Sequence, residues 1–322
     1  MTPFTALEGP GPTFGRLLTI CLLAIAAQSA VMAQIEVHSR SIKGSSPSGD
    51  TFINVDGIRM HFLIRGKGPA VVLIHGNPGF LQDYSLTVFD SLAKNFETIA
   101  FDRPGHGLTP RGNKYSKSLN GQAKLLHDAM TMLGINRPIL VGHSFGGTLA
   151  LIYSLQYPND ISGMVLLAPS AFPYGPGNIL ESVIAHVPVL GNLLIRTLRP
   201  LVIHEINAGL SNSFSPAPTP RFYKNLADRI WSSPARLKAY IYDSAELRNA
   251  VNQLSRRYGE IKTPVTIISG IHDQVVGYQT DAVPLHQAIA GSRLITLTGA
   301  GHAIQYENPR AVVDAVNAMK TR

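Results

Sequence analysis

Cysteine is nearly absent from this chain, which has a single one, Cys21, among 322 residues. One cysteine cannot form an intramolecular disulfide, so a disulfide framework is excluded. Cys21 also lies near the N-terminus, and the preceding Leu18-Thr19-Ile20 lacks the small residue expected before a lipidated cysteine. The domain that follows this segment therefore has no thiol.

Charged residues are also sparse, at 15%, and the net charge of +8 is spread along the chain. The longest basic pair is Arg256-Arg257, so the sequence has no basic stripe that could neutralise a nucleic-acid backbone. The glycines of Gly142–Gly147 and of Gly105-x-Gly107 lack the G-x-G-x-x-G spacing and the following acidic residue of a dinucleotide loop. We therefore expect no nucleic-acid partner, no metal and no cofactor.

The N-terminal segment has the features of a targeting signal. Arg16 precedes the apolar run Leu17–Ala27, and Val31-Met32-Ala33 supplies small residues of the kind that a signal peptidase recognises. We expect residues 1–33 to direct export and the mature chain to begin at Gln34. An uncleaved anchor is the alternative, because the apolar run can be extended to about 17 residues, just short of a membrane span.

After a linker at residues 34–50, strand and helix patterns alternate. Asp56-Gly57 is a tight-turn dipeptide, so Thr51–Val55 and Ile58–Arg65 are predicted to form an antiparallel hairpin. Six apolar runs typical of strands buried on both faces follow at Ala70–Ile74, Thr98–Phe101, Ile139–Val141, Met164–Leu167, Val265–Ile268 and Leu294–Leu297. Segments with helical periodicity lie between most of them, at Leu119–Leu133, Phe145–Gln156, Asp281–Ala290 and Pro309–Met319.

This alternation predicts an α/β fold, with eight strands in a doubly wound, mostly parallel sheet and helices on both faces. The strand pattern stops between Ala168 and Lys262, where proline-punctuated helical segments replace it. Intervals of this length are usually functional covers. We therefore expect residues 51–171 and 262–322 to form the core and residues 172–261 to form a helical cap over the strand ends.

The segment Gly142-His143-Ser144-Phe145-Gly146 has the G-x-S-x-G pattern and lies between a predicted strand and a predicted helix. A side chain in place of either glycine would collide with the neighbouring element, and the turn lifts Ser144 out of the backbone. A serine hydroxyl becomes nucleophilic when a base takes its proton. His302 follows the last predicted strand, at the edge of the sheet where ligands bind. Asp273 follows the predicted strand Val265–Ile268 and can hold the imidazole of His302 in one tautomer.

The order Ser144, Asp273, His302 is the one found in hydrolases with this turn, and it differs from the order in the major serine protease classes. Negative charge develops on the substrate oxygen during attack, and one N–H group aimed at that oxygen contributes roughly 3 kcal/mol. The expected donors are the backbone amide of Asn77, in the loop after Ala70–Ile74, and that of Phe145, at a helix N-terminus.

The other acids and histidines near strand ends have structural interpretations. Asp102, with Arg103, is expected to brace its own loop. His75, His106 and His143 lie in turns where a ring nitrogen can bond the backbone, and their spacing is not that of metal ligands.

Five motifs in this order together resemble the α/β-hydrolase superfamily, in the branch with a helical cap inserted after the sixth core strand. They are His75-Gly76-Asn77-Pro78-Gly79, Asp102-Arg103-Pro104-Gly105-His106-Gly107, Gly142-His143-Ser144-Phe145-Gly146, Gly270-Ile271-His272-Asp273 and Gly301-His302. The resemblance covers about Thr51 to Met319. It implies that Ser144, Asp273 and His302 form a catalytic triad and that Asn77 and Phe145 provide the oxyanion hole.

Departures from related families narrow the activity. Haloalkane dehalogenases and epoxide hydrolases of this fold have an aspartate where Ser144 stands, so both activities are disfavoured. Proline iminopeptidases have a similar helix after the nucleophile, but their loop usually has glycine in place of Asn77. Their cap also carries acids for the substrate amine, and the acids available in this cap are Glu181, Glu205, Asp228, Asp243 and Glu246.

The apolar stretch Ile179–Ile203 predicts a cap packed on the core and an apolar roof above the site, which favours esters with an acyl or aryl group. We therefore predict an exported serine hydrolase that cleaves carboxylic esters with an apolar acyl or aryl group through an acyl-enzyme. The alternatives with the same triad are an iminopeptidase and a hydrolase of carbon–carbon bonds in ring-cleavage products. A non-catalytic binding protein is the alternative from another class. No feature indicates an oligomeric state.

Overall fold

The computed structural model describes residues 51–112, 114–175, 179–231 and 233–320. The signal or anchor predicted at residues 1–33 and the linker at 34–50 lie outside the described residues. The described part belongs to Asp50–Arg322, one of the two units into which the chain divides. None of its helices combines the length and the apolar character needed to span a membrane.

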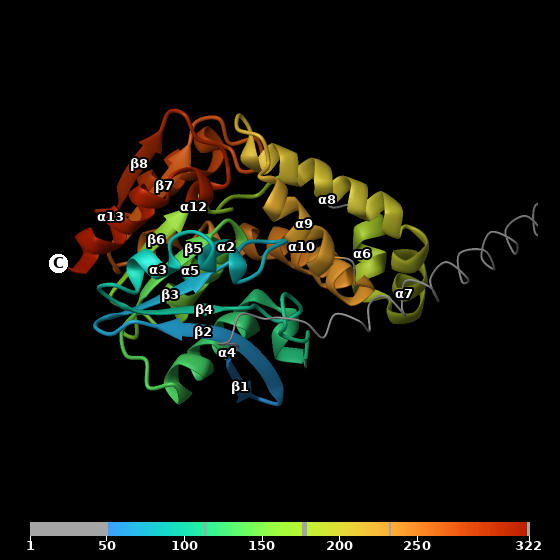
Figure 1. Ribbon diagram of the computed structural model, residues 1–322, viewed down its shortest axis with the longest axis horizontal. Coiled ribbons are helices and arrows are strands. Elements are labelled where there is room, and N and C mark those ends of the chain that lie inside the picture. Colours follow the sequence, from blue (N-terminus) through green and yellow to red (C-terminus); the bar gives the residue numbers. More distant parts are fainter. Residues whose placement is uncertain (1–50, 113, 176–178, 232, 321–322) are drawn as a thin grey trace, which may run out of the picture. The chain divides into compact units, whose positions relative to one another are not determined.

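Eight strands form a single, mostly parallel sheet, as predicted (Figure 1). Their order across the sheet is β1-β2-β4-β3-β5-β6-β7-β8. Only the β1/β2 and β2/β4 pairs among these strands are antiparallel. The strands are β1 (Thr51–Val55), β2 (Ile58–Arg65), β3 (Ala70–Ile74), β4 (Glu97–Phe101), β5 (Ile139–His143), β6 (Gly163–Leu167), β7 (Val265–Gly270) and β8 (Arg293–Leu297).

The hairpin of β1 and β2 turns at Asp56-Gly57, as predicted, and pairs Val55 with Ile58. The backbone φ angles of Asp56 and Gly57 are 49° and 78°. Two successive residues with positive φ form the hairpin turn whose twist matches that of the strands, which explains the Asp-Gly sequence.

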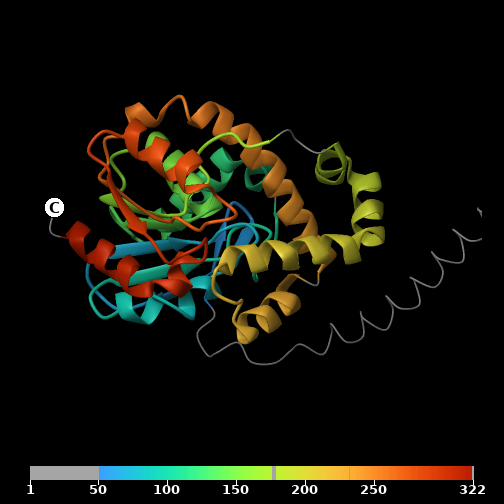
Figure 2. The ribbon, with the colours of Figure 1, turned by 90° about the horizontal axis from the view of Figure 1, so that it is seen from above.

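The central strands are buried on both faces because helices cover both sides of the sheet. Val72 and Ile74 of β3 pack in one hydrophobic cluster with residues of α4 (Leu119–Met132) and α5 (Phe145–Gln156). The alternate residues, Val71 and Leu73, pack in a second cluster with residues of α3 (Phe89–Leu92) and α13 (Pro309–Lys320). Figure 2 shows α4 and α5 on one side of the sheet and α3 and α13 on the other. This is the doubly wound arrangement that the uniformly apolar strands predict.

The long helices of the core lie where the sequence predicts them. α5 has the predicted bounds, and α4 begins after Ser118, whose hydroxyl caps it by accepting a hydrogen bond from the Gly121 amide. The helix predicted at Asp281–Ala290 is found as the shorter α11 (Val283–Ala288), which follows a π-helical turn, η3 (Tyr278–Ala282). The remaining core elements are too short to show a period: α2 (Gln82–Ser85), η1 (Lys114–Lys117), η2 (Tyr258–Glu260) and α12 (Ile304–Glu307).

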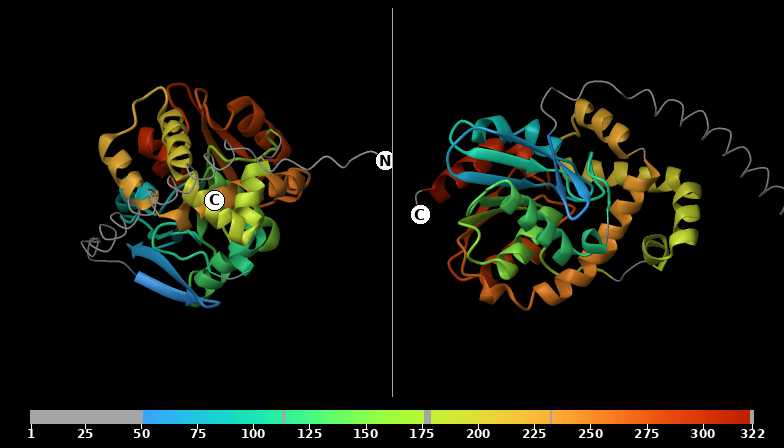
Figure 3. Two further views of the ribbon diagram at one scale, coloured as in Figure 1. Left: turned by 90° about the vertical axis from the view of Figure 1, so that its right-hand side faces the viewer. Right: turned by 90° about the horizontal axis from the view of Figure 1, so that it is seen from below.

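In the described part of the chain, five helices lie between β6 and β7, and we call them the cap. They are α6 (Ile179–His186), α7 (Pro188–Thr197), α8 (Arg199–Phe214), α9 (Arg221–Trp231) and α10 (Pro234–Leu254). The long helix α10 leads from the cap back to the sheet domain (Figure 3). Its residues Leu247, Val251 and Leu254 join the core cluster that contains α4 and α5, so α10 belongs to the cap and the core at once.

The apolar stretch at Ile179–Ile203 packs on the rest of the protein only in part. Ile184 and Ile195 are buried in the cap cluster as expected. The prediction is wrong for the residues that leave 42–59% of their surface exposed, namely Val187, Leu190, Leu193 and Leu201. A helix that packs on one side leaves the apolar residues of its other side in solvent, and no period in the stretch reveals which side that is.

Candidate active site

Ser144 occupies a strained turn between β5 and α5. Its backbone angles are φ 53° and ψ −116°, outside the common regions for a residue with a side chain. A Cβ on Gly146 would lie 2.1 Å from the Ile74 carbonyl oxygen, and one on Gly142 would lie 2.3 Å from the Gly146 carbonyl oxygen. As predicted, only glycine fits at these two positions. The turn therefore lets β3, β5 and α5 approach closely while Ser144 stands at the carboxyl edge of the sheet.

Asp273 and His302 meet at the same edge, after β7 and β8. His302 Nδ1 lies 2.7 Å from Asp273 Oδ2, and the carboxylate of Asp273 is fully buried. The other carboxylate oxygen accepts hydrogen bonds from the amides of Val275 and Val276, both at 2.8 Å. Burial alone would raise the pKa of Asp273, but the interactions with His302 and the two amides outweigh it and hold this pKa below its ordinary value. An ionised Asp273 accepts a hydrogen bond from the Nδ1–H group of His302, so Nε2 is the unprotonated, basic nitrogen.

The histidine loop lies against the segment that contains Ser144. His143 Nε2 is 2.9 Å from the carbonyl oxygen of His302, and the two imidazole rings have centroids 4.6 Å apart. Within the described part of the chain, the Ser144 hydroxyl and His302 are not joined by a hydrogen bond. Catalytic hydrogen bonds are often long or poorly aligned without substrate and tighten in the substrate complex.

The two amides predicted to bind an oxyanion are not engaged elsewhere. Among the described residues, neither the Asn77 nor the Phe145 backbone N–H donates a hydrogen bond. Phe145 is the first residue of α5, where the helix dipole favours negative charge. The side chain of Asn77 bonds the cap, through Nδ2 to the Tyr240 carbonyl oxygen at 3.0 Å and to Ser244 Oγ at 3.1 Å.

The three histidines assigned structural roles do bond the backbone. A ring nitrogen of each lies within 3.2 Å of a carbonyl oxygen, of Gly76 for His75, of Pro104 for His106 and of His302 for His143. Burial lowers the pKa of all three, to about 3 for His143, where the neighbouring His302 adds to the effect. In the ranges that the structure describes, no group of three or more His, Cys, Asp or Glu residues is placed to hold a metal ion.

Asp102 braces its own loop, as predicted, because it accepts a hydrogen bond from the Leu108 amide at 2.8 Å. It also makes two contacts that the sequence does not indicate. Its other oxygen accepts from the Leu81 amide at 2.8 Å, and His61 Nδ1 lies 2.7 Å from its carboxylate. All of these partners lie on the core, which agrees with a structural role for Asp102.

The cap contacts the histidine loop directly, which sequence reasoning missed. The carbonyl oxygen of Ser213, in α8, accepts hydrogen bonds from the amides of His302 at 3.1 Å and Ala303 at 2.8 Å. A Cβ on Gly301 would lie 1.9 Å from the Ser215 carbonyl oxygen, so the glycine of the Gly301-His302 motif allows this close approach. The only sequence signal for the contact is this glycine.

A buried carboxyl group also joins the core to the cap. Asp83, in α2, is 3% exposed and accepts a hydrogen bond from the hydroxyl of Tyr223, in α9, at 2.9 Å. Burial raises the pKa of Asp83 to about 7, against the opposing effects of the Tyr223 hydroxyl and the Phe80 amide, and with a smaller contribution from Asp102. The folded protein therefore binds this proton more tightly than the unfolded chain does.

Replacement of Asp83 by asparagine is expected to remove a pH dependence of stability. Since the folded pKa is raised, the stability contributed by neutral Asp83 is present near pH 4 and is lost as the pH rises towards about 7, by about 4 kcal/mol at most. Urea unfolding at pH 5 and pH 8 should show that the wild type loses more stability over this interval than Asp83→Asn. The matched control is Asp90→Asn, at an exposed carboxylate. Equal losses in all three proteins would contradict the assignment.

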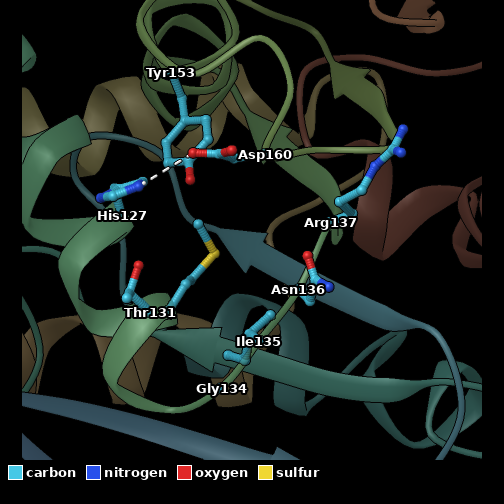
Figure 4. A pocket seen from close by; sticks show the side chains of 9 residues that line it. His127, Thr131, Gly134, Ile135, Asn136, Arg137, Tyr153 and Asp160 are labelled. Carbon is cyan, nitrogen blue, oxygen red and sulfur yellow. Dashed lines mark ion pairs between the residues drawn. The ribbon is translucent and has the colours of Figure 1, made fainter.

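A pocket of about 320 Å³ lies on another part of the core (Figure 4). Its wall includes an ion pair of His127 and Asp160, with Nε2 3.2 Å from the carboxylate, and the ring of Tyr153. Its residues at 134–137 and 160 precede β5 and β6, whereas Ser144 follows β5. Ligands of such sheets bind at the carboxyl ends of the strands, so this pocket is not the candidate active site.

Comparison with known proteins finds a family profile and similar proteins, a monoacylglycerol lipase among them. The family profile described as "alpha/beta hydrolase fold" matches residues 69–309. Monoacylglycerol lipase ABHD6 of Homo sapiens is 28% identical over 265 residues, which cover 76% of this chain and 73% of that protein. Uncharacterized protein Rv2715 of Mycobacterium tuberculosis is 27% identical over 300 residues, covering 88% and 85%.

Solved structures have the same fold. An esterase from Exiguobacterium antarcticum superposes with a TM-score of 0.69 at 22% identity, over 84% of this chain and 99% of that one. A hydrolase from Pseudomonas aeruginosa superposes with a TM-score of 0.70, also at 22% identity, over 86% and 100%.

Proposed function

The chain belongs to the α/β-hydrolase fold family, and from this premise we propose that it is a serine hydrolase of carboxylic esters with an apolar acyl or aryl group. The observation that most directly supports the proposal is the buried His302–Asp273 pair beside the strained Ser144 turn. Such a turn exposes a nucleophile, and such a pair supplies an oriented base. Lipases and esterases among similar proteins agree with this chemistry.

In the proposed mechanism, Ser144 Oγ attacks the carbonyl carbon of the ester while His302 Nε2 takes the hydroxyl proton. Asp273 keeps the imidazole in the required tautomer and stabilises it when protonated. The amides of Asn77 and Phe145 donate to the carbonyl oxygen as it becomes negative. His302 then gives the proton to the leaving alcohol, and water activated by the same histidine cleaves the acyl-enzyme.

The surroundings of the site support an apolar substrate. Ala303, next to the proposed base, packs in the hydrophobic cluster that the cap forms with the core residue Phe80. Aromatic rings make up much of this cluster, and Phe80 lies 5.8 Å from Tyr223 and 6.0 Å from Trp231 between ring centroids. An acyl or aryl group that reached the cap interior would therefore leave water for an apolar environment.

The acids of the cap disfavour an aminopeptidase, which needs a free carboxylate for the substrate amine. Asp243 is buried and paired with Arg103 and Arg111. The other four are paired near the surface or exposed: Glu181 with Arg248, Glu246 with His186, and Glu205 and Asp228 in exposed positions.

A substrate panel tests the proposal against its rivals. We expect the purified protein to release p-nitrophenol from p-nitrophenyl butyrate, to leave proline p-nitroanilide intact, and not to bleach a dienone ring-cleavage product. Hydrolysis of the proline amide or of the dienone in preference to the ester would replace this proposal with the corresponding rival. Loss of all three activities, with no labelling by a fluorophosphonate, would support a binding protein.

We also propose that residues 1–33 export the protein, on the sequence evidence of Arg16, the apolar run Leu17–Ala27 and the small residues before Gln34. N-terminal sequencing of the protein purified from its native cells is expected to start at Gln34. A chain that retains Leu17–Ala27 and sediments with membranes would show an anchor instead.

A further inference from the structure

Arg103 is the residue that holds the loop before Asn77. Its side chain donates from Nε to the carbonyl oxygen of His75 at 3.1 Å and from Nη2 to that of Gly76 at 2.8 Å. Its backbone amide donates to His75 Nε2 at 2.9 Å. One guanidinium therefore fixes two successive peptide groups of the loop, and the second of them, between Gly76 and Asn77, carries the Asn77 amide.

The same guanidinium contacts the second proposed oxyanion donor. Its central carbon lies 4.0 Å from the ring centroid of Phe145, the first residue of α5. Cations are attracted to the faces of aromatic rings, and a planar guanidinium stacks there well. Arg103 thus connects the loop that carries Asn77 to the helix start that carries Phe145.

Arg103 is 2% exposed, so its charge needs a buried partner. That partner comes from the cap: Asp243, in the middle of α10, is fully buried and accepts from Arg103 Nη1 at 2.7 Å. Gln122, in α4, accepts from the same nitrogen at 3.0 Å and donates to Asp243 at 3.1 Å. The sequence places Asp243 in the cap but gives no sign that it reaches the core.

A second set of contacts ties the same helix to the same loop. The Asn77 side chain donates to the Tyr240 carbonyl oxygen and to Ser244 Oγ, which flank Asp243 on α10. His106 Nε2 lies 3.0 Å from Asn77 Oδ1, so both ends of this amide group are bonded. Two independent paths, one through Arg103 and one through the Asn77 side chain, therefore run from α10 to the loop.

We propose that Asp243 of the cap helix α10 is a positioning residue for ester hydrolysis: through Arg103 it orients the loop whose Asn77 amide stabilises the oxyanion. This inference rests on the proposed ester hydrolysis. It implies that the oxyanion hole is complete only while the cap is seated on the core. The carboxylate affects catalysis without contact with the substrate, so its loss lowers the rate of the chemical step rather than substrate binding.

Asp243→Asn tests the inference, with Glu246→Gln as the control. The control removes the same charge from the same helix, at a side chain that pairs with His186 near the surface. With p-nitrophenyl butyrate, kcat of Asp243→Asn is expected to fall about 10- to 100-fold while KM stays within about twofold. Glu246→Gln is expected to retain the wild-type kcat. A kcat of Asp243→Asn equal to that of the control would overturn the proposal.

Amide hydrogen exchange provides a readout that does not need activity. In Asp243→Asn, exchange is expected to accelerate in residues 75–80 and to stay at the wild-type rate in α8 and α9. Equal acceleration throughout the cap would show that Asp243 anchors the cap in general, and would refute the specific role. If the wild type does not cleave the ester, the proposed function fails, while this exchange pattern still decides whether Asp243 orients the loop.

Ser244→Ala covers the case in which Asp243→Asn does not fold. It removes one of the two acceptors of the Asn77 amide group and leaves Arg103 paired. We expect faster exchange in residues 75–80 and a severalfold lower kcat. Exchange and kcat at wild-type values would contradict control of the loop by α10 through the Asn77 side chain.

Discussion

Replacement of Ser144 by alanine is expected to lower kcat for p-nitrophenyl butyrate by at least about 10⁴-fold. The hydroxyl oxygen forms the bond to the acyl group, and no neighbouring group can take over that step. Alanine keeps the Cβ, and the amides of Asn77 and Phe145 remain, so substrate binding should change little. The measurement is steady-state kinetics on protein whose fold is verified by circular dichroism.

The matched control is Ser154→Ala, in the helix α5 that follows Ser144. Ser154 is 2% exposed and its hydroxyl donates to the Leu151 carbonyl oxygen at 2.8 Å, away from the turn. It should keep the wild-type kcat within about threefold, since it costs only a local hydrogen bond. If Ser144→Ala hydrolysed the ester as fast as this control, an acyl-enzyme on Ser144 would be ruled out.

Asp273→Asn is expected to produce the second large effect, a loss of about 10³- to 10⁴-fold in kcat. The asparagine amide group would donate towards His302 Nδ1 and favour the tautomer with the proton on Nε2, which cannot act as a base. The asparagine oxygen can still accept the hydrogen bonds from the Val275 and Val276 amides, so the loop should keep its conformation. Kinetics and thermal unfolding together measure both effects.

Asp281→Asn is a close structural control for this variant. The Asp281 carboxylate also accepts two backbone amides, those of Ala171 and Phe172, at 2.9 and 3.0 Å. The hydroxyl of Thr280 also donates a hydrogen bond to this carboxylate. We expect kcat of Asp281→Asn within about threefold of wild type. A comparable loss in both variants would mean that the decrease comes from loop distortion and not from the histidine.

The sequence predicts the core well because apolar runs and turn residues indicate each element from within its own segment. The apolar runs that begin at Ala70 and Ile139 are typical of strands buried on both faces, and Asp56-Gly57 favours a tight turn. The helix Phe145–Gln156 is found with its predicted bounds because Gly142 before it and Gly146 at its start allow the close packing that sets where it begins. Short helices such as α2 were missed, since four residues show no period.

Part of the candidate site could be predicted from the sequence, and part could not. Ser144, Asp273 and His302 follow from motifs at the ends of strands, and the structure brings the last two within hydrogen-bonding distance. The support that reaches the site from the cap could not be predicted. Asp243 meets Arg103 across 140 residues of sequence, and Ser213 meets His302 from the end of α8. Such contacts depend on how the cap packs on the core, and the hydrophobic periodicity of the sequence does not reveal that packing.

Fluorophosphonate labelling followed by peptide mapping tests the central claim most directly. The reagent phosphonylates a serine only when an adjacent base activates it, so the account predicts one adduct, on the peptide that contains Ser144. The same adduct should be absent from Ser144→Ala and form far more slowly in Asp273→Asn. An adduct on another residue, or ester hydrolysis by a wild-type protein that resists the label, would contradict the account.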